Sequence, residues 1–380
     1  MSIQSEITRI GGNIASAYTA VSGKGGTLPS ARNSANLPAA INSIPSRPLI
    51  INTAADIQAA LDLNFDLTEF VGEQITCAKG NTTLTWDIVD YDSTTHEVTL
   101  LLHDTLPDQL VFEPKQALAY FGNGLAAGNY KFLCNGTTYY FTLATAIPAG
   151  GQLMATTSTF TTYQSQDSTS SLVSGTVSKT QIAGATSLGT TASGDLNHMD
   201  RVNYGSNNLK ESALLWWLNT DAAANTLVPR TNKFSRAYKY GVAGFLNGLD
   251  PAFLACVADT VWKCATNQVY EAPASMGGTV ATSTAYTITA KFCLASRKEI
   301  FGDSDGTPDG STQFDLYVGA TAIDRKKYYN GSVRIWWLRS AYPRDAYHER
   351  RVSTGGSVSN VSFAGESYGV VPACKIRKST

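Results

Sequence analysis

The chain has 380 residues and a nearly balanced charge, with 29 Lys and Arg against 30 Asp and Glu. This length allows two or three folding units, and the balance gives no overall field that would attract nucleic acid or an anionic membrane. Charged residues are only 16% of the chain, whereas glycine (32) and tyrosine (18) are common. The composition therefore favours a protein rich in strands and loops over a helical enzyme.

The N-terminus has no apolar stretch of the signal-peptide type, and no segment approaches the roughly 18 to 20 apolar residues of a membrane span. We therefore expect a soluble chain made in the cytoplasm, without membrane insertion. The cysteines show no CxxC pair and no histidine at zinc-ligand spacing, so we interpret them as buried thiols and not metal ligands. They are Cys77, Cys134, Cys256, Cys264, Cys293 and Cys374.

The first residues show apolar side chains at alternating spacings of four and three, which is the a/d pattern of a coiled coil. The residues of this seam are Ile3, Ile7, Ile10, Ile14, Ala17 and Val21. Isoleucine at both positions favours trimers or tetramers, although Gly11 and Gly12 each cost about 1 kcal/mol relative to alanine. An amphipathic helix that lies on its own domain explains the spacing equally well.

The helix is followed by two predicted linkers. The first is 22–48, with a small docking element near 39–44, and the second is 49–70.

The next residues alternate in the manner of strands. Residues 83–92 and 96–104 predict a β-hairpin, and Pro114 in a first turn predicts a helix over 113–121. Further strands are expected at 130–134, 138–144 and 151–157. Residues 165–194 hold few large apolar side chains, so we expect an extended surface loop or an edge hairpin there.

Helical patterns become stronger in the second half of the chain. Residues 209–218 place their large apolar residues on one face after an asparagine cap, which predicts a core helix. Asp250 and Pro251 predict the start of a second helix. A strand over 286–296, a helical turn at 297–302 and an aromatic block at 335–338 follow.

The order of "SALLWWLNTDAAA", "GFLNGLDPAFLACV", "TAKFCLASRKEIFG", "QFDLY", "WWLRS" and "GVVPA" after the hairpin resembles a bacterial and phage family of unknown-function domains with a C-type-lectin-like fold. The resemblance spans 83–373. It implies an α+β chain with a C-type-lectin-like (formylglycine-generating-enzyme-like) domain over 71–380 and a β-rich insertion at about 113–194. The opening "IQSEITRIGGNIASAYTAVSGKGGTLP" is similar to the start of phage tail-associated proteins, which implies that residues 1–48 are a helical oligomerisation and virion-attachment segment.

The C-terminal motifs also resemble the variable proteins of diversity-generating retroelements, in which two fixed motifs frame a hypervariable surface. The opening motif is Trp337 to Ser340 and the closing motif is Gly369 to Ala373, with Val371 where that family usually has arginine. The implied scaffold frame is Trp336, Trp337, Leu338, Arg339, Gly369 and Pro372. Most residues of 341–350 are products expected when asparagine codons are mutated at adenines, but Glu349 is not.

The resemblance implies that two aperiodic runs form a ligand-binding surface, 341–350 and 359–367. The implied contact residues are Ala341, Tyr342, Pro343, Arg344, Asp345, Ala346, Tyr347, His348, Glu349, Arg350, Ser359, Asn360, Ser362, Phe363, Ala364, Glu366 and Ser367. Tyrosine and phenylalanine provide contact area at low entropic cost, and the charged residues provide specificity. The candidate anchors are Tyr342, Tyr347, Phe363 and Tyr368.

These features predict a tail-associated receptor-binding protein of a phage or prophage virion, diversified by a retroelement. Its partners would be a bacterial surface protein or glycan, other tail proteins and, in a homotrimer, its own copies. The alternative is a structural tail protein whose lectin-like domain contacts other virion subunits.

Catalysis and metal binding receive less support from the sequence. His348 has no nucleophile or paired carboxylate nearby in the sequence, and Cys256 and Cys264 lack the spacing of formylglycine-generating enzymes, so we expect no enzyme and no cofactor. Asp303, Asp305 and Asp309 are similar to calcium loops, but the spacing departs from the EF-hand pattern. A plain Asp/Gly turn is the alternative.

Overall fold

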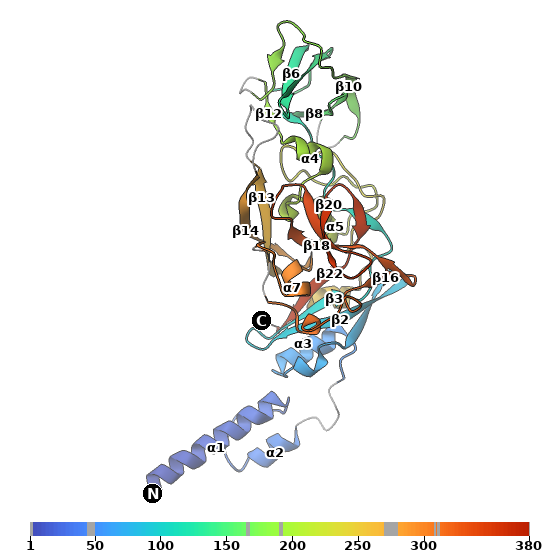
Figure 1. Ribbon diagram of the computed structural model, residues 1–380. Helices are drawn as coiled ribbons and strands as arrows, with labels where there is room; N and C mark the ends of the chain where they lie inside the picture. Colours follow the sequence, from blue (N-terminus) through green and yellow to red (C-terminus); the bar gives the residue numbers. More distant parts are fainter. Residues whose placement is uncertain are drawn as a thin grey trace.

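The computed structural model describes residues 3–43, 50–164, 168–189, 193–269, 280–307, 309 and 312–379. Figure 1 shows an elongated molecule with the N-terminal helices at one end, the main body in the middle and a smaller β-rich part at the other end. The described chain is α+β, with short helices and mostly antiparallel sheets. None of its described helices combines the length and apolar character that crossing a bilayer requires.

The helix predicted from the isoleucine spacing is present as α1 (Ile3–Gly23). The predicted docking element is the short helix α2 (Leu37–Asn42), which packs against the C-terminal half of α1. The residues buried between the two helices are Tyr18, Val21 and Ala40. In the N-terminal half of α1, Ile7 is 57% exposed and Ile10 is 48% exposed. The apolar seam is therefore covered at one end and open at the other.

The range 49–70, predicted to be a linker, contains a core helix. Helix α3 (Ala54–Asp62) begins with a capping box in which Thr53 and Asp56 bond each other's backbone N–H. Ile57 is fully buried in the main hydrophobic core. The linker prediction is wrong for these residues, because apolar side chains of α3 pack against α6 and β22, and their burial offsets the cost of ordering the chain.

The predicted hairpin belongs to a five-stranded sheet with the order β1-β2-β3-β22-β15. Its strands are β1 (Gln74–Lys79), β2 (Thr82–Asp92), β3 (Glu97–Leu102), β22 (Pro372–Arg377) and β15 (Phe292–Leu294). The hairpin prediction is confirmed by the antiparallel β2–β3 pairing. Strand β22 also pairs with β3, so the last strand of the chain returns beside the hairpin.

A second sheet has the order β14-β13-β18-β19-β20, with β21 pairing β18 and β4 pairing β21. Its strands are β14 (Val280–Ala290), β13 (Thr260–Val269), β18 (Trp336–Ala341), β19 (His348–Val352), β20 (Val358–Phe363), β21 (Ser367–Gly369) and β4 (Gln109–Val111). The strand predicted over 286–296 is therefore divided between two sheets, because β14 ends at Ala290 and β15 starts at Phe292.

The residues predicted to be an insertion have their own hydrophobic core, which extends from Leu118 to Val202. One sheet contains β10 (Ser171–Thr176), β9 (Thr159–Tyr163), β8 (Gly151–Ala155), β5 (Ala119–Phe121) and β12 (Asp195–Leu196). The other contains β11 (Thr186–Ser187), β6 (Gly128–Cys134) and β7 (Thr137–Leu143). The three predicted strands are confirmed and β10 is an edge strand, but the helix predicted over 113–121 is wrong. Its residues are irregular or in β5, because pairing with β8 overrides local propensity.

The remaining elements are short. They are η1 (Thr68–Phe70), α4 (Met199–Tyr204), η2 (Leu209–Glu211), α5 (Ala213–Leu218), α6 (Pro251–Cys256), α7 (Arg297–Phe301), η3 (Asp315–Tyr317), β16 (Lys327–Tyr329) and β17 (Ser332–Arg334). The helix predicted over 209–218 is present as η2 and α5, and Asp250 caps α6 as predicted. All six cysteines are free and buried, which confirms their interpretation as packed thiols.

Candidate functional site

The two motifs predicted to frame the variable surface lie side by side. Trp336 of β18 is paired in parallel with Gly369 of β21. Both indole N–H groups are satisfied, since Trp336 Nε1 donates to Arg325 O at 3.2 Å and Trp337 Nε1 donates to Leu110 O at 2.9 Å. A Cβ on Gly369 would lie 2.9 Å from Ile335 O, so the close approach of the two strands requires glycine. The run between the motifs therefore begins and ends at one fixed place.

The remaining frame residues are buried, and Arg339 holds the opening strand by charge. Its guanidinium donates to both carboxylate oxygens of Glu299 at 2.5 Å, and it also donates to Leu294 O at 2.7 Å. Burial lowers the pKa of Arg339, but the charge and hydrogen bond of Glu299, together with Cys293 and Cys264, leave that pKa above its ordinary value. Arg339 thus provides a buried ion pair at the opening motif.

The structure corrects the contact role predicted for almost half of the surface. Strand β19 lies between β18 and β20 in the sheet, and four of its five residues are buried. The buried residues of the predicted surface are Ala341, Ala346, His348, Glu349, Arg350, Ser362 and Ala364. These residues support the surface and do not form it.

The loop between β18 and β19 keeps part of the predicted surface accessible. Arg344 is exposed, and Tyr342, Pro343 and Tyr347 are half-buried. The Asp345 carboxylate accepts the backbone N–H of Tyr347 at 3.1 Å and that of His348 at 2.8 Å. Its second oxygen lies 2.6 Å from Nδ1 of His348. Asp345 therefore fixes the loop. Its carboxylate, which was predicted to contact a ligand, bonds groups of the protein itself.

Five aromatic rings meet at this loop, and we name them the aromatic cluster: Tyr204, Tyr342, Tyr347, His348 and Phe363. Tyr204 stacks on Phe363 with 4.1 Å between ring centroids and on Tyr347 with 5.0 Å. His348 lies 4.3 Å from Tyr347 and 4.9 Å from Phe363, and Tyr342 meets His348 edge-on at 6.1 Å. Stacked and edge-on rings at these separations stabilise one another. The cluster is a rigid, partly exposed aromatic surface.

Tyr204 was missed by the sequence analysis, because it lies far from the variable run, at the end of α4. Its carbonyl accepts the N–H of Gly365 at 2.7 Å. Gly205 follows with φ of +90°, and a Cβ there would lie 2.3 Å from Glu113 O, so only glycine fits this junction. The Asn207 amide then donates to Asp345 O and His348 O, each at 2.9 Å. Residues 204–207 therefore brace the loop from the side of the insertion.

One tyrosine of the cluster, Tyr347, has a raised pKa. Burial, together with the nearby Asp345 and Asp200 carboxyls, raises the pKa of Tyr347 to about 12. Its hydroxyl is therefore protonated at neutral pH and is able to donate a hydrogen bond. Burial also raises the pKa of Asp200.

The second predicted run contributes mainly through Phe363. Ser359 is half-buried and Ser367 is exposed, whereas the Asn360 side chain lies outside the described residues. Glu366 accepts a hydrogen bond from the Tyr368 hydroxyl at 2.8 Å, and Tyr368 packs edge-on against Trp337. Tyr368, predicted to be an anchor, therefore packs toward the frame.

Two of the three aspartates of the weak calcium candidate form ion pairs with arginines. Arg297 binds Asp303 at 2.7 Å and Asp305 at 3.3 Å, and the buried Arg350 binds Asp305 at 2.7 Å. Asp309 is fully buried, and burial raises its pKa to about 6. Within the described residues, no group of three or more His, Cys, Asp or Glu side chains is placed to hold a metal ion.

Residues 177–378 match the model of a protein family described as a domain of unknown function, DUF6273, and the match covers more than half of the chain. The chain belongs to the DUF6273 family. The matched range begins within the predicted insertion and includes every ring of the aromatic cluster. The comparisons with curated proteins and with solved structures gave no match.

Proposed function

We propose that this DUF6273 protein is a tail-associated receptor-binding protein of a phage or prophage, with a C-type-lectin-like domain that recognises a bacterial surface ligand. The motif order supports this fold, as does the return of β22 to the opening hairpin. The observation that carries the proposal is the aromatic cluster, since it presents half-buried rings next to the exposed Arg344.

The cluster has the physical properties of a recognition surface. Its rings come from α4, the 342–347 loop, β19 and β20, and hydrogen bonds to the backbone hold these segments together. Aromatic side chains held in this way lose little conformational entropy on binding and provide a large contact area. A loop on a rigid scaffold is also the usual place for binding residues. We therefore assign ligand contact to Tyr342, Arg344, Tyr347 and Phe363.

If a retroelement varies this run, burial limits the positions at which substitutions are tolerated. Glu349 is fully buried on β19, so most substitutions there would leave a cavity or an unpartnered polar group. This explains why an otherwise variable run contains a residue that asparagine-codon mutagenesis does not produce. Variation would be tolerated at the accessible positions 342–345 and 347.

Oligomerisation through α1 would increase the strength with which such a surface binds its ligand. Ile7 and Ile10 are exposed in the single chain and continue the spacing that Ile14 begins. We propose that three copies cover this open half of the seam, while α2 covers the other half. Figure 1 shows α1 at the end of the molecule away from the β-rich part. Several weak sites on one trimer would then bind by avidity.

The test is adsorption of purified protein to cells of the host bacterium. The combined change Tyr342→Ala, Tyr347→Ala and Phe363→Ala should abolish adsorption while leaving virion assembly unchanged. Tyr163→Ala, at a half-buried tyrosine of β9, is the matched control and should adsorb like the wild type. Normal adsorption of the triple variant with failed assembly would favour the structural tail protein instead.

Programmed variation has a separate test in the neighbouring DNA. We expect an imperfect copy of the codons for residues 336–373 beside a reverse transcriptase gene, with differences confined to adenines. A locus without that copy would remove the diversification proposal and leave ligand binding to be decided by adsorption.

A further inference from the structure

Strand β14 lies at one end of the seven-stranded sheet. Within the described part of the chain, β14 pairs with β13 alone. Its sequence, "VATSTAYTITA", has no charged residue and no proline. Natural sheets usually protect their edges with charges, proline or a covering segment, because unpaired backbone groups accept further strands. The edge of β14 has neither of the two sequence features that would prevent pairing.

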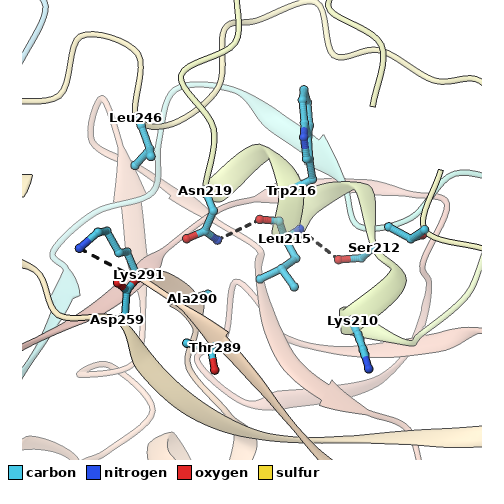
Figure 2. Close-up of a pocket in the computed structure, with 11 residues that line it drawn as sticks. Lys210, Ser212, Leu215, Trp216, Asn219, Leu246, Asp259, Thr289, Ala290 and Lys291 are labelled. Carbon is cyan, nitrogen blue, oxygen red and sulfur yellow. Dashed lines mark hydrogen bonds and ion pairs between the residues drawn. The ribbon is translucent and has the colours of Figure 1, made fainter. Parts of the chain in front are cut away.

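A hollow of about 470 Å³ lies beside the last residues of this strand. Three consecutive residues, Thr289, Ala290 and Lys291, line it (Figure 2). Thr289 and Ala290 are the last two residues of β14 and Lys291 directly follows the strand. Successive residues of a strand face opposite sides of a sheet, so a hollow lined by both Thr289 and Ala290 reaches the edge at the end of the strand. The opposite wall is α5, from which Leu215 points toward the end of β14 (Figure 2). The hollow thus has room for side chains of a strand beside β14.

The surroundings of the hollow are positively charged. Lys210 and Lys291 stand on its two sides, and Lys263 is exposed on the neighbouring strand β13. Lys291 donates to Val257 O at 2.6 Å and lies 4.0 Å from Asp259, the one carboxylate in the lining. Lys210 is exposed, and its backbone N–H donates to the Tyr286 hydroxyl at 3.2 Å. The backbone of Lys210 is therefore held next to the Tyr286 side chain of β14.

We propose that this edge binds an extended, acidic segment of another protein as an added β-strand. The backbone of the segment would pair with β14, an apolar side chain would enter the hollow against Leu215 and Ala290, and a carboxylate would meet Lys210. Main-chain pairing gives affinity in this mode and side-chain pockets give specificity. Pairing with β14 of a second copy is disfavoured, because β14 offers no carboxylate and would bring lysines together. This site is separate from the aromatic cluster, so it does not depend on the function proposed above.

The probe is a synthetic seven-residue peptide in which threonine, valine and glutamate alternate. Bound to the full-length protein, it should slow amide hydrogen exchange at residues 285–290 by about tenfold or more, because the edge N–H groups become bonded. Lys210→Glu should weaken binding about fivefold or more by charge reversal. Lys179→Glu, at an exposed lysine of the insertion, is the matched control and should bind as the wild type does.

Two further peptides make the proposal falsifiable. Replacing every glutamate with lysine should remove binding, and N-methylation of alternate peptide bonds should remove exchange protection, because the added strand loses its donors. The proposal is overturned if the glutamate peptide at millimolar concentration leaves exchange at 285–290 unchanged. It is also overturned if the lysine peptide binds equally well, or if the edge is already protected in a dimer without peptide.

Discussion

The run 342–350 has two adjoining parts that differ in exposure, the loop 342–347 and residues 348–350 of β19. Residues 342–347 form a loop that keeps Arg344 exposed and two tyrosines half-buried. His348, Glu349 and Arg350, which follow directly, are buried in a strand flanked on both sides. An aperiodic sequence therefore does not show whether its side chains are accessible to solvent. A strand covered on both faces needs no alternation, so its polar residues look like those of a loop.

Arg339→Ala should give the largest effect, because it removes the cation of a pair whose side chains are 1% and 3% exposed. Leaving Glu299 buried without its partner should cost about 3–5 kcal/mol of unfolding free energy. Urea unfolding followed by tryptophan fluorescence measures this. Arg344→Ala, in the exposed half, should stay within about 0.5 kcal/mol of the wild type. If the two variants lost equal amounts of unfolding free energy, the division between a buried frame and an exposed surface would be contradicted.

Leucine substitutions at two neighbouring positions should give an intermediate effect. Ala346 is 1% exposed, so Ala346→Leu should cost about 1–3 kcal/mol through overpacking. Arg344→Leu places the same side chain two residues earlier, where solvent accommodates it. Thermal unfolding of both variants is the measurement, and a normal melting temperature for Ala346→Leu would show that the loop is looser than the structure indicates.

Glu349→Gln changes the shape of the side chain least. It tests the burial of residues 348–350 through the pH dependence of the free energy of unfolding. Burial raises the pKa of Glu349 well above its usual 4.5, and its second carboxylate oxygen has no hydrogen-bond partner. The unfolded chain releases this proton near pH 4.5 and the folded chain retains it to higher pH. Wild-type stability should therefore fall as pH rises above 4.5, until the folded pKa is passed.

Glu349→Gln should lose this part of the pH dependence, because glutamine has no proton to release. Urea unfolding between pH 4.5 and 8 compares the two proteins. Parallel stability curves across this range would mean that Glu349 titrates equally in the folded and unfolded states, and hence that solvent reaches it.

Sequence patterns predicted the elements whose signals are local. The β2–β3 hairpin, the caps of η2 and α6 and the α1 helix follow from alternation, capping residues and heptad spacing within short windows. The burial of both tryptophans of the opening motif also agrees with the frame predicted for them. These features depend on neighbours that are close in the chain, so one sequence is enough to find them.

Other features depend on contacts that are distant in the chain. Helix α3 is ordered by packing in the main core, and residues 113–121 are irregular or in β5, which pairs with β8. Tyr204 reaches the loop only because Gly205 and Asn207 fit against Glu113, Asp345 and His348. No pattern within a short segment of the sequence predicts such contacts.

The sequence by itself determined the residue types of the candidate surface and the motifs that fix its two ends. Which of those residues meet solvent depends on the tertiary structure, because Asp305 pairs with the buried Arg350 and Tyr204 stacks on Phe363, and both partners are distant in the chain. The tertiary structure also left the edge of β14 unpaired among the described strands. Exposure is a property of the packed chain, whereas capping, alternation and heptad spacing are properties of short segments.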